Sequence, residues 1–178
     1  MIALEKIAAI CSGRIHGTFR GNISSISLDS RKIEKGDLFI CLKGEKTDGH
    51  FYLDQAFQRG AFAALVERVP DILPENWTLI QVESTSKALL DLASYWRNQF
   101  HPIVIGVTGT VGKTTTKEMI ATLLSGTFNL LKNEGNLNTE FGVPLTLFKL
   151  RENHQLLVLE LGLQKPGDVR ILSQLTRP

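Results

Sequence analysis

The chain has 178 residues, of which 43% are hydrophobic and 21% are charged. This balance is typical of a folded globular protein and excludes an intrinsically disordered one. The 20 basic and 18 acidic residues give a net charge of +2, so a nucleic acid is not expected as a partner.

The first 83 residues have the pattern of a small α+β domain. Apolar residues at helical spacing predict a helix near residues 4–11. A second helix is expected after Asp48, which can cap it, and before Gly60. Short apolar or alternating runs predict strands at residues 23–28, 38–42, 61–66 and 78–82.

Residues 84–100 are expected to form a helix that connects this domain to a second one. The helix would carry one apolar face, made of Leu89, Leu92, Ala93 and Trp96. No apolar run is long enough to span a bilayer, and the N-terminus lacks the pattern of a signal peptide. We therefore expect a cytoplasmic protein without membrane insertion.

A different pattern begins at residue 101 and continues to residue 178. The apolar run at residues 103–107 predicts a strand buried on both faces, and a glycine-rich loop and a helix follow it. We expect Met119, Ile120, Leu123 and Leu124 of that helix to face inward. Strands at 128–131 and 156–161, with a helix at 142–150, complete a parallel α/β pattern. Three strands are few for such a sheet, so residues 101–178 are expected to be the first part of a truncated domain.

The glycine-rich loop is a candidate phosphate-binding loop. Glycines allow a tight turn in which successive backbone N–H groups converge on phosphate oxygens, and the helix N-terminus adds its positive dipole end. Lys113 is expected to contact the β- and γ-phosphates of a nucleotide, and the Thr114 hydroxyl to bind Mg²⁺. The residues predicted to bind the nucleotide are Gly109, Thr110, Val111, Gly112, Lys113, Thr114 and Thr115.

Two further segments are expected at the same edge of the sheet. Glu160 lies at the carboxyl end of the last predicted strand, and ligands bind at the carboxyl ends of parallel strands. Its carboxylate is therefore predicted to hold Mg²⁺, directly or through water. Asn136 and Asn138 follow the strand before it, and spacing alone leaves open whether they bind a ligand or are ordinary loop residues.

Three stretches of the chain resemble the Mur ligase family. They are Asp29 to Ile40 with Gly44-Glu45 and Asp48-Gly49-His50 after it, Thr114 to Met119, and Gly135-Asn136-Leu137-Asn138 running into Gly142-Val143-Pro144. The loop from Gly106 to Thr115 also has the longer glycine spacing of that family's phosphate loop. The resemblance covers essentially the whole chain.

The resemblance implies an ATP-dependent amide ligase of peptidoglycan precursor synthesis, and we expect a monomer. The Gly-Val-Pro stretch favours the member that joins D-alanyl-D-alanine to UDP-N-acetylmuramoyl-tripeptide through an acyl phosphate. Lys113 and Glu160 would then be catalytic, with Thr114 and Glu160 as magnesium ligands. The substrate-binding residues that the resemblance implies are Ser30, Arg31, Lys43, Gly44, Asp48, His50, Asn136 and Asn138.

Two alternatives stay open. One is another amide ligase of the superfamily, such as the enzyme that adds the third stem residue or a folylpolyglutamate synthetase, although Asp29-Ser30-Arg31 argues against the latter. The other is a nucleotide-binding module without catalysis; a GTPase is disfavoured because no Asn-Lys-x-Asp stretch occurs. Val111 stands where the family usually has asparagine or another polar residue, and Thr139 stands where asparagine is common. The family's further metal-site histidine, modified lysine and C-terminal domain are absent from 178 residues, so the chain is expected to be inactive alone.

Overall fold

The computed structural model describes residues 2–18, 20–44 and 47–178. Glu45, which belongs to one of the matched stretches, lies outside the described residues. The chain forms two compact units, Met1–Leu92 and Ala93–Pro178. The division falls within helix α3 (Thr85–Arg97), and the domain boundaries expected at residues 83 and 100 stay predictions.

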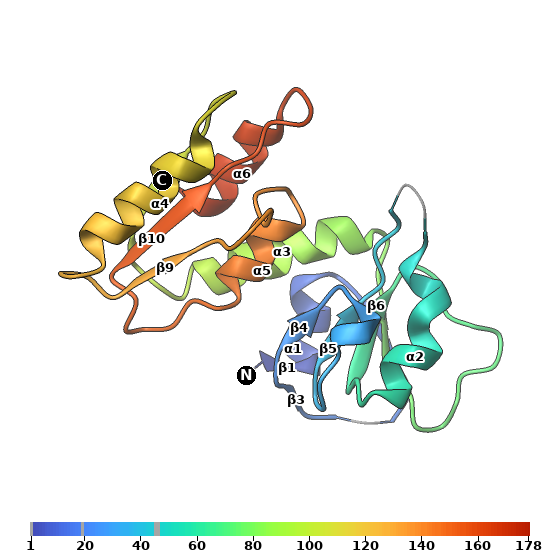
Figure 1. The fold of residues 1–178 in the computed structure, drawn as a ribbon. Helices are drawn as coiled ribbons and strands as arrows, with labels where there is room; N and C mark the ends of the chain where they lie inside the picture. Colours follow the sequence, from blue (N-terminus) through green and yellow to red (C-terminus); the bar gives the residue numbers. More distant parts are fainter. Residues whose placement is uncertain (1, 19, 45–46) are drawn as a thin grey trace. The chain divides into compact units, whose positions relative to one another are not determined.

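The first unit is built on a five-stranded sheet with the order β2-β7-β6-β5-β4 (Figure 1). The strands are β2 (Arg14–His16), β4 (Ile26–Ser27), β5 (Leu38–Ile40), β6 (Ala63–Val66) and β7 (Leu79–Gln81). β4 to β7 pair in parallel, and β2 pairs antiparallel with β7. Every residue of β5 and β6 is buried, as expected for parallel strands covered on both faces.

Short helices surround this sheet. They are α1 (Leu4–Ile10), α2 (Leu53–Gln58) and the 3₁₀ turns η1 (Ser30–Lys32) and η2 (Gly49–Tyr52); a small ladder pairs β1 (Ile2–Ala3) with β3 (Asn22–Ile23). The α2 side is closed by an apolar cluster in which Phe57 stacks on Trp77 at 4.4 Å between ring centroids. Asp48 caps η2, so the predicted cap is confirmed, but one turn of 3₁₀ helix lies between it and α2.

The second unit contains the parallel sheet that the sequence predicts. Its strand order is β8-β10-β9, with β8 (Ile103–Val107), β9 (Leu130–Lys132) and β10 (Leu156–Glu160). β10 lies between the other two strands and is buried along its whole length. The helices are α4 (Lys113–Leu124), α5 (Gly142–Leu147) and α6 (Asp168–Thr176). Across the described residues of both units, no helix has the length and apolar character needed to cross a bilayer.

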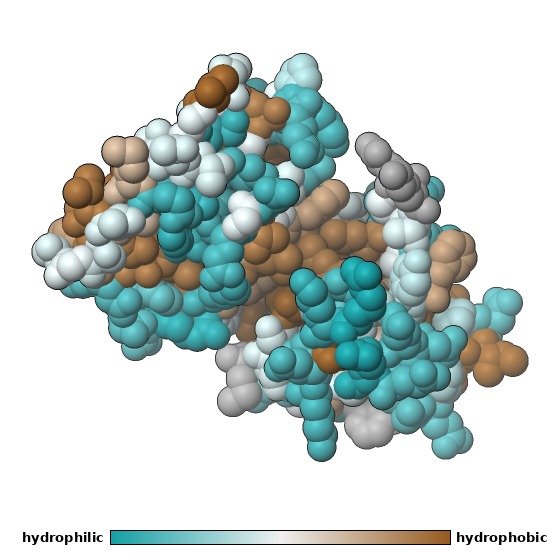
Figure 2. Space-filling view, viewed as in Figure 1, coloured by the Kyte–Doolittle hydropathy of each residue, from teal (hydrophilic) through white to brown (hydrophobic). Residues whose placement is uncertain are grey.

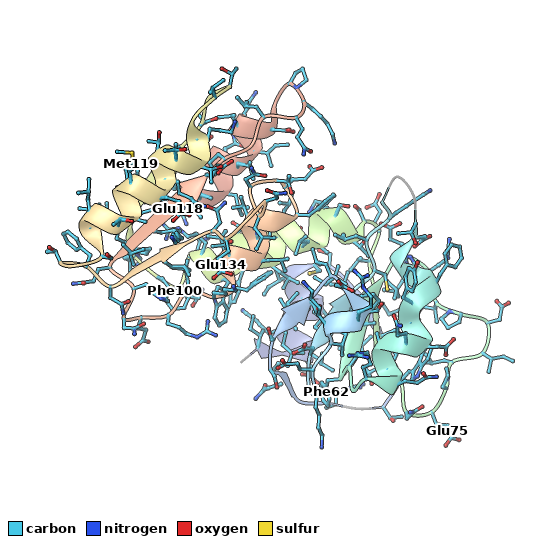
Figure 3. The ribbon with its side chains drawn as sticks, in the orientation of Figure 1. Phe62, Glu75, Phe100, Glu118, Met119 and Glu134 are labelled. Carbon is cyan, nitrogen blue, oxygen red and sulfur yellow. The ribbon has the colours of Figure 1, made fainter. Side chains whose placement is uncertain are left out.

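One prediction about α4 is wrong. Met119 and Leu123 are 61% and 78% exposed, whereas the buried residues of this helix are Lys117 and Ala121. Figure 3 shows Met119 on the side of α4 that faces away from the sheet, and Figure 2 shows apolar side chains there. Thr114 contacts Glu160 at the end of β10, and the buried residues Lys117 and Ala121, at positions i+3 and i+7 from Thr114, lie on the same face of α4.

Candidate nucleotide and metal site

The predicted phosphate loop connects the end of β8 to the first residue of α4. Gly109 and Gly112 have φ values of +136° and +78°, which side-chain-bearing residues rarely adopt. The Lys113 ammonium donates to the carbonyl of Gly109 at 2.6 Å and lies 3.5 Å from that of Thr110. The structure thus places predicted residues 109–112 in the turn before a twelve-residue helix and residues 113–115 in the first turn of that helix.

Glu160 is the centre of the polar contacts beside this loop. It is the last residue of β10 and only 3% exposed, so it does not face solvent. Its Oε2 accepts a hydrogen bond of 2.7 Å from the Thr114 hydroxyl, and its Oε1 accepts one of 2.8 Å from Asn138 Nδ2. Three predicted residues from three different segments therefore meet at one carboxylate.

The environment of Glu160 keeps this carboxylate charged. Burial raises its pKa, but the hydrogen bonds from Thr114 and Asn138, together with the charges of Lys117 and Lys113, outweigh burial. The net result is a pKa below the ordinary value of 4.5. A buried carboxylate that stays ionised is suited to hold a cation.

The ligand set fits magnesium. A hydroxyl and a carboxylate are the oxygen ligands that this ion prefers, and magnesium usually takes its other ligands from water and nucleotide phosphates. Among the described residues, no cluster of three or more His, Cys, Asp or Glu could hold a metal by itself. Thr114 and Glu160 are thus suited to a cation that arrives with a nucleotide.

In the first unit, the segment 29–31 is held by its own side chains. Asp29 accepts hydrogen bonds from the backbone N–H of Arg31 and from Nε and Nη2 of its guanidinium, at 2.9–3.0 Å. The side-chain hydrogen bond from Arg31 lowers the pKa of Asp29 from 3.8 to about 2. Ser30 is buried and donates to Gln55 Oε1 at 2.5 Å, whereas the Arg31 side chain is 78% exposed.

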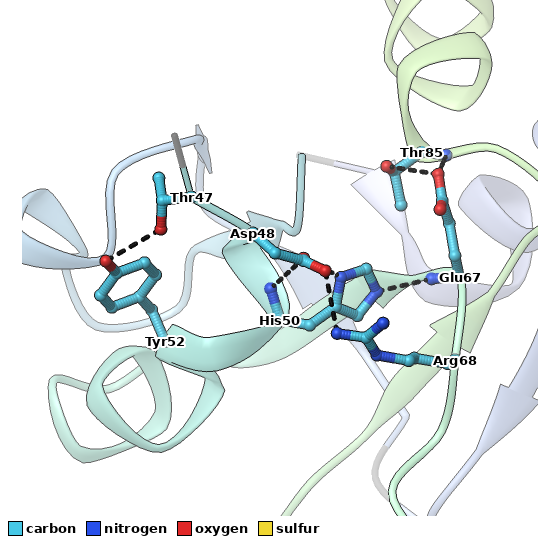
Figure 4. A network of polar contacts seen from close by, with 7 residues as sticks. All are labelled: Thr47, Asp48, His50, Tyr52, Glu67, Arg68 and Thr85. Atoms are coloured by element: carbon cyan, nitrogen blue, oxygen red, sulfur yellow. Dashed lines mark hydrogen bonds and ion pairs between the residues drawn. The ribbon is translucent and has the colours of Figure 1, made fainter. Parts of the chain in front are cut away.

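The segment 47–50 is held by a network with more distant residues (Figure 4). Asp48 Oδ1 contacts both the backbone N–H of His50 and its ring Nδ1, and Asp48 Oδ2 accepts from Arg68. His50 Nε2 accepts from the backbone N–H of Glu67 at 2.9 Å, which leaves Nδ1 as the ring nitrogen that faces Asp48. Lys43 forms a β-bridge with Asp48, which brings Lys43, Gly44, Asp48 and His50 into one loop region.

Some residues of the site were missed by sequence reasoning. Arg68 and Glu67 complete the network around His50, and Lys117 and Asn133 are buried beside Glu160. Lys117 could have been found from its position one turn after Thr114, on the same face of the helix. Asn136 is exposed, and its carbonyl accepts from the backbone N–H of Asn138.

The second unit has a phosphate loop between a strand and a helix, and a buried acid ends the neighbouring parallel strand. These features define a nucleotide-binding P-loop domain. Comparison with family models gives the particular family. Residues 107–178 match the Mur ligase middle domain, and residues 22–97 match the model described as Mur ligase family, catalytic domain. The chain therefore belongs to the Mur ligase family.

Individual relatives agree with this assignment. UDP-N-acetylmuramoyl-tripeptide–D-alanyl-D-alanine ligase of Bacillus subtilis (strain 168) is 42% identical over 156 residues, which cover 88% of this chain and 34% of the relative. A crystal structure of MurF from Acinetobacter baumannii matches with a TM-score of 0.88 and 36% identity, over 98% of this chain and 38% of that one. MurF of Thermotoga maritima in complex with ADP gives a TM-score of 0.76 and 36% identity, over 85% and 35%. The chain thus spans little more than a third of the length of these relatives.

Proposed function

We propose that this chain forms the UDP-substrate-binding and nucleotide-binding part of a ligase that adds D-alanyl-D-alanine to UDP-N-acetylmuramoyl-tripeptide with conversion of ATP to ADP and phosphate. The observation that carries the proposal is the contact of Thr114 with the buried Glu160 directly behind the phosphate loop. The name of the Bacillus relative and the ADP bound to the Thermotoga relative support it. We place the reaction in the cytoplasm and expect a monomer.

The proposed chemistry has two steps. A carboxylate oxygen of the tripeptide attacks the γ-phosphorus of ATP, the bond to ADP breaks, and an acyl phosphate forms. The amine of D-alanyl-D-alanine then attacks the acyl carbon, phosphate leaves, and the nitrogen loses a proton as the amide forms. Catalysis of phosphoryl transfer depends chiefly on positioning and on stabilising charge.

The residues of the second unit would supply both contributions. The backbone N–H groups of residues 109–114 would bind the phosphates, and Lys113 would turn from the loop carbonyls to the β- and γ-phosphates when the nucleotide enters. A magnesium ion held by Thr114 and Glu160 would neutralise charge on the transferred phosphoryl group. Asn138 would keep the Glu160 carboxylate in its orientation through their hydrogen bond.

The residues of the first unit would hold the uridine-nucleotide end of the tripeptide substrate. Two guanidinium nitrogens of Arg31, Nε and Nη2, donate to Asp29. The remaining guanidinium nitrogen of this exposed side chain would bind an anionic diphosphate. Both ring nitrogens of His50 are engaged within the unit and its side chain is only 6% exposed, so His50 would hold the shape of the substrate-binding loop. Ser30, Lys43, Gly44 and Asp48 would complete this subsite, and Asn136 of the second unit stays a predicted substrate contact.

Nucleotide binding tests the proposal first. Lys113→Ala should lose measurable ADP binding in calorimetry with magnesium, whereas Lys149→Ala, which removes an exposed lysine of the same unit, should bind as the wild type does. Equal affinities for the wild type and Lys113→Ala would contradict the assignment of the loop. In the complete protein, ADP release should require both the tripeptide substrate and D-alanyl-D-alanine. Turnover with a single amino acid in place of the dipeptide would favour another ligase of the superfamily.

A further inference from the structure

Two buried polar residues beside Glu160 have no part in the reaction described above. Lys117 is 1% exposed and Asn133 is fully buried. Burying an ammonium or an amide group is unfavourable unless hydrogen bonds satisfy it. Both side chains are satisfied, and their bonds lead to the residues of the proposed metal site.

Asn133 extends the ladder between β9 and β10. The register of these strands ends where Val158 pairs with Lys132, although β10 continues to Glu160. Beyond that point the Asn133 side chain takes the place of a strand: Nδ2 donates to the Glu160 carbonyl and Oδ1 accepts from the Glu160 N–H, both at 2.9 Å. The main chain of Glu160 is therefore fixed on the β9 side by one amide side chain.

The side-chain amide of Asn133 also holds the segment that carries Asn138, the hydrogen-bond partner of the Glu160 carboxylate. Asn133 Nδ2 donates a second hydrogen bond, of 2.7 Å, to the carbonyl of Leu137. The next residue is Asn138, which donates to Glu160 Oε1. Only a side-chain amide of this length carries both the two donors and the acceptor that this arrangement uses. Asn133 thus sets the positions of Glu160 and of Asn138 together.

Lys117 connects this arrangement to α4. Its ammonium donates to the backbone carbonyl of Asn133 at 2.7 Å and lies 3.1 Å from Glu118, which balances its charge. Lys117 is one helical turn after Thr114, whose hydroxyl contacts Glu160 Oε2. The helix that carries Thr114 and the strand that carries Glu160 are therefore joined through Asn133 as well as through their direct contact.

We propose that Lys117 and Asn133 form a buried brace that positions the Glu160 carboxylate against Thr114 and Asn138 for magnesium bound with the nucleotide. The inference rests on the proposed function of the site. Both are positioning residues, because their polar groups bond to the protein main chain and to Glu118. Residues that orient a metal ligand commonly change metal affinity by about 10–100-fold when they are replaced.

Magnesium-dependent ADP affinity in the complete protein tests the brace without measuring turnover. Calorimetry with magnesium and with EDTA gives the factor by which magnesium strengthens ADP binding. Asn133→Ala should reduce this factor by about 10–100-fold and leave the affinity in EDTA unchanged. Lys117→Met, which keeps length and removes the ammonium, should reduce it less. Asn129→Ala is the matched control, because Asn129 is exposed at the opposite end of β9.

The outcomes separate the brace from the site that it supports. Thermal unfolding establishes that each variant is folded, and Lys117→Met decides the question if Asn133→Ala does not fold. The brace would be overturned if magnesium strengthens ADP binding in the folded Asn133 and Lys117 variants as much as in the wild type. If Glu160→Gln loses this strengthening in the same series, the proposed metal site is still supported. A wild-type protein whose ADP affinity is the same with and without magnesium would overturn the proposed site and the brace together.

Discussion

The polar residues around Glu160 and those of the segments 29–31 and 47–50 are held in different ways. Around Glu160, hydrogen bonds join residues 22 to 46 positions apart in the sequence. In the first unit, Asp29 bonds to Arg31 and Asp48 bonds to His50, each two positions further along the chain. The cluster around Glu160 depends on the tertiary fold, whereas the turns at Asp29 and Asp48 are fixed by local contacts and are joined to the rest of the unit through Gln55, Glu67 and Arg68.

This difference indicates how each region responds to change. Local contacts fix the backbone of a short segment and leave a side chain such as Arg31 exposed, where it can bind a ligand. Long-range contacts converge on a buried group, so a shift in any contributing segment moves that group. Substitutions around Glu160 should therefore lower the stability of the fold and disturb several segments, whereas substitutions at Arg31 should have small and local effects.

The largest effect is expected from crowding the segment that carries Asn138. A Cβ atom added at Gly142 would lie 2.6 Å from Leu137 Cα and 2.7 Å from its carbonyl carbon, so backbone must move. Gly142→Ala should lower the free energy of unfolding by about 3 kcal/mol, at the upper end of overpacking costs, and should weaken magnesium-dependent ADP binding. Gly126→Ala is the control, because no heavy atom lies within 4 Å of its Cβ position. Denaturant unfolding that gave equal stabilities would show that the segment is not tightly held.

A smaller effect is expected at Asp48, whose network combines local and long-range contacts. Asp48→Ala leaves the backbone N–H and ring Nδ1 of His50 without their acceptor and removes the contact with Arg68. The free energy of unfolding should fall by about 1–3 kcal/mol. Asp71→Ala, at an exposed position of the same unit, should change it little. If urea titrations showed the same loss of unfolding free energy for both variants, the network around Asp48 would not stabilise the fold.

The smallest effect is expected at Arg31. Its side chain lowers the pKa of Asp29 to about 2, so Arg31→Ala should return that pKa toward 3.8 in a carboxyl NMR titration. Because the folded pKa lies below the ordinary value, the pair stabilises the fold above pH 3.8, and this stabilisation is lost as the pH falls toward 2. Arg31 is exposed, so stability at neutral pH should change little. An unchanged Asp29 pKa would mean that the pair does not form in solution.

Local sequence patterns predicted much of this structure. The phosphate loop, the order of strands and helices in the second unit and the position of Glu160 at a strand end follow from glycine spacing and apolar runs. The sequence did not predict that β4 to β7 run parallel, because strand direction depends on pairing between distant segments. The 3₁₀ turns η1 and η2 and helix α6 were also not predicted.

Two errors near the site have one physical origin. Apolar spacing placed Met119 and Leu123 inward and gave no role to Lys117, whereas α4 turns Lys117 toward the sheet. The buried face of α4 also carries Thr114, whose partner Glu160 lies 46 residues away, and apolar spacing alone does not record that contact. Asn133 was likewise indistinguishable from an ordinary loop asparagine, because its partners lie on β10 and in the segment before Asn138.

The central claim is that Glu160, together with Thr114, holds magnesium for the bound nucleotide. The most direct test is calorimetric titration of ADP into the wild type and Glu160→Gln, each with magnesium and with EDTA. Glutamine keeps the size of the side chain and an oxygen acceptor for Thr114 but removes the charge that the cation requires. The account predicts that magnesium strengthens ADP binding in the wild type and has little effect in Glu160→Gln, while the affinities in EDTA are similar. Equal strengthening by magnesium in both proteins would contradict it.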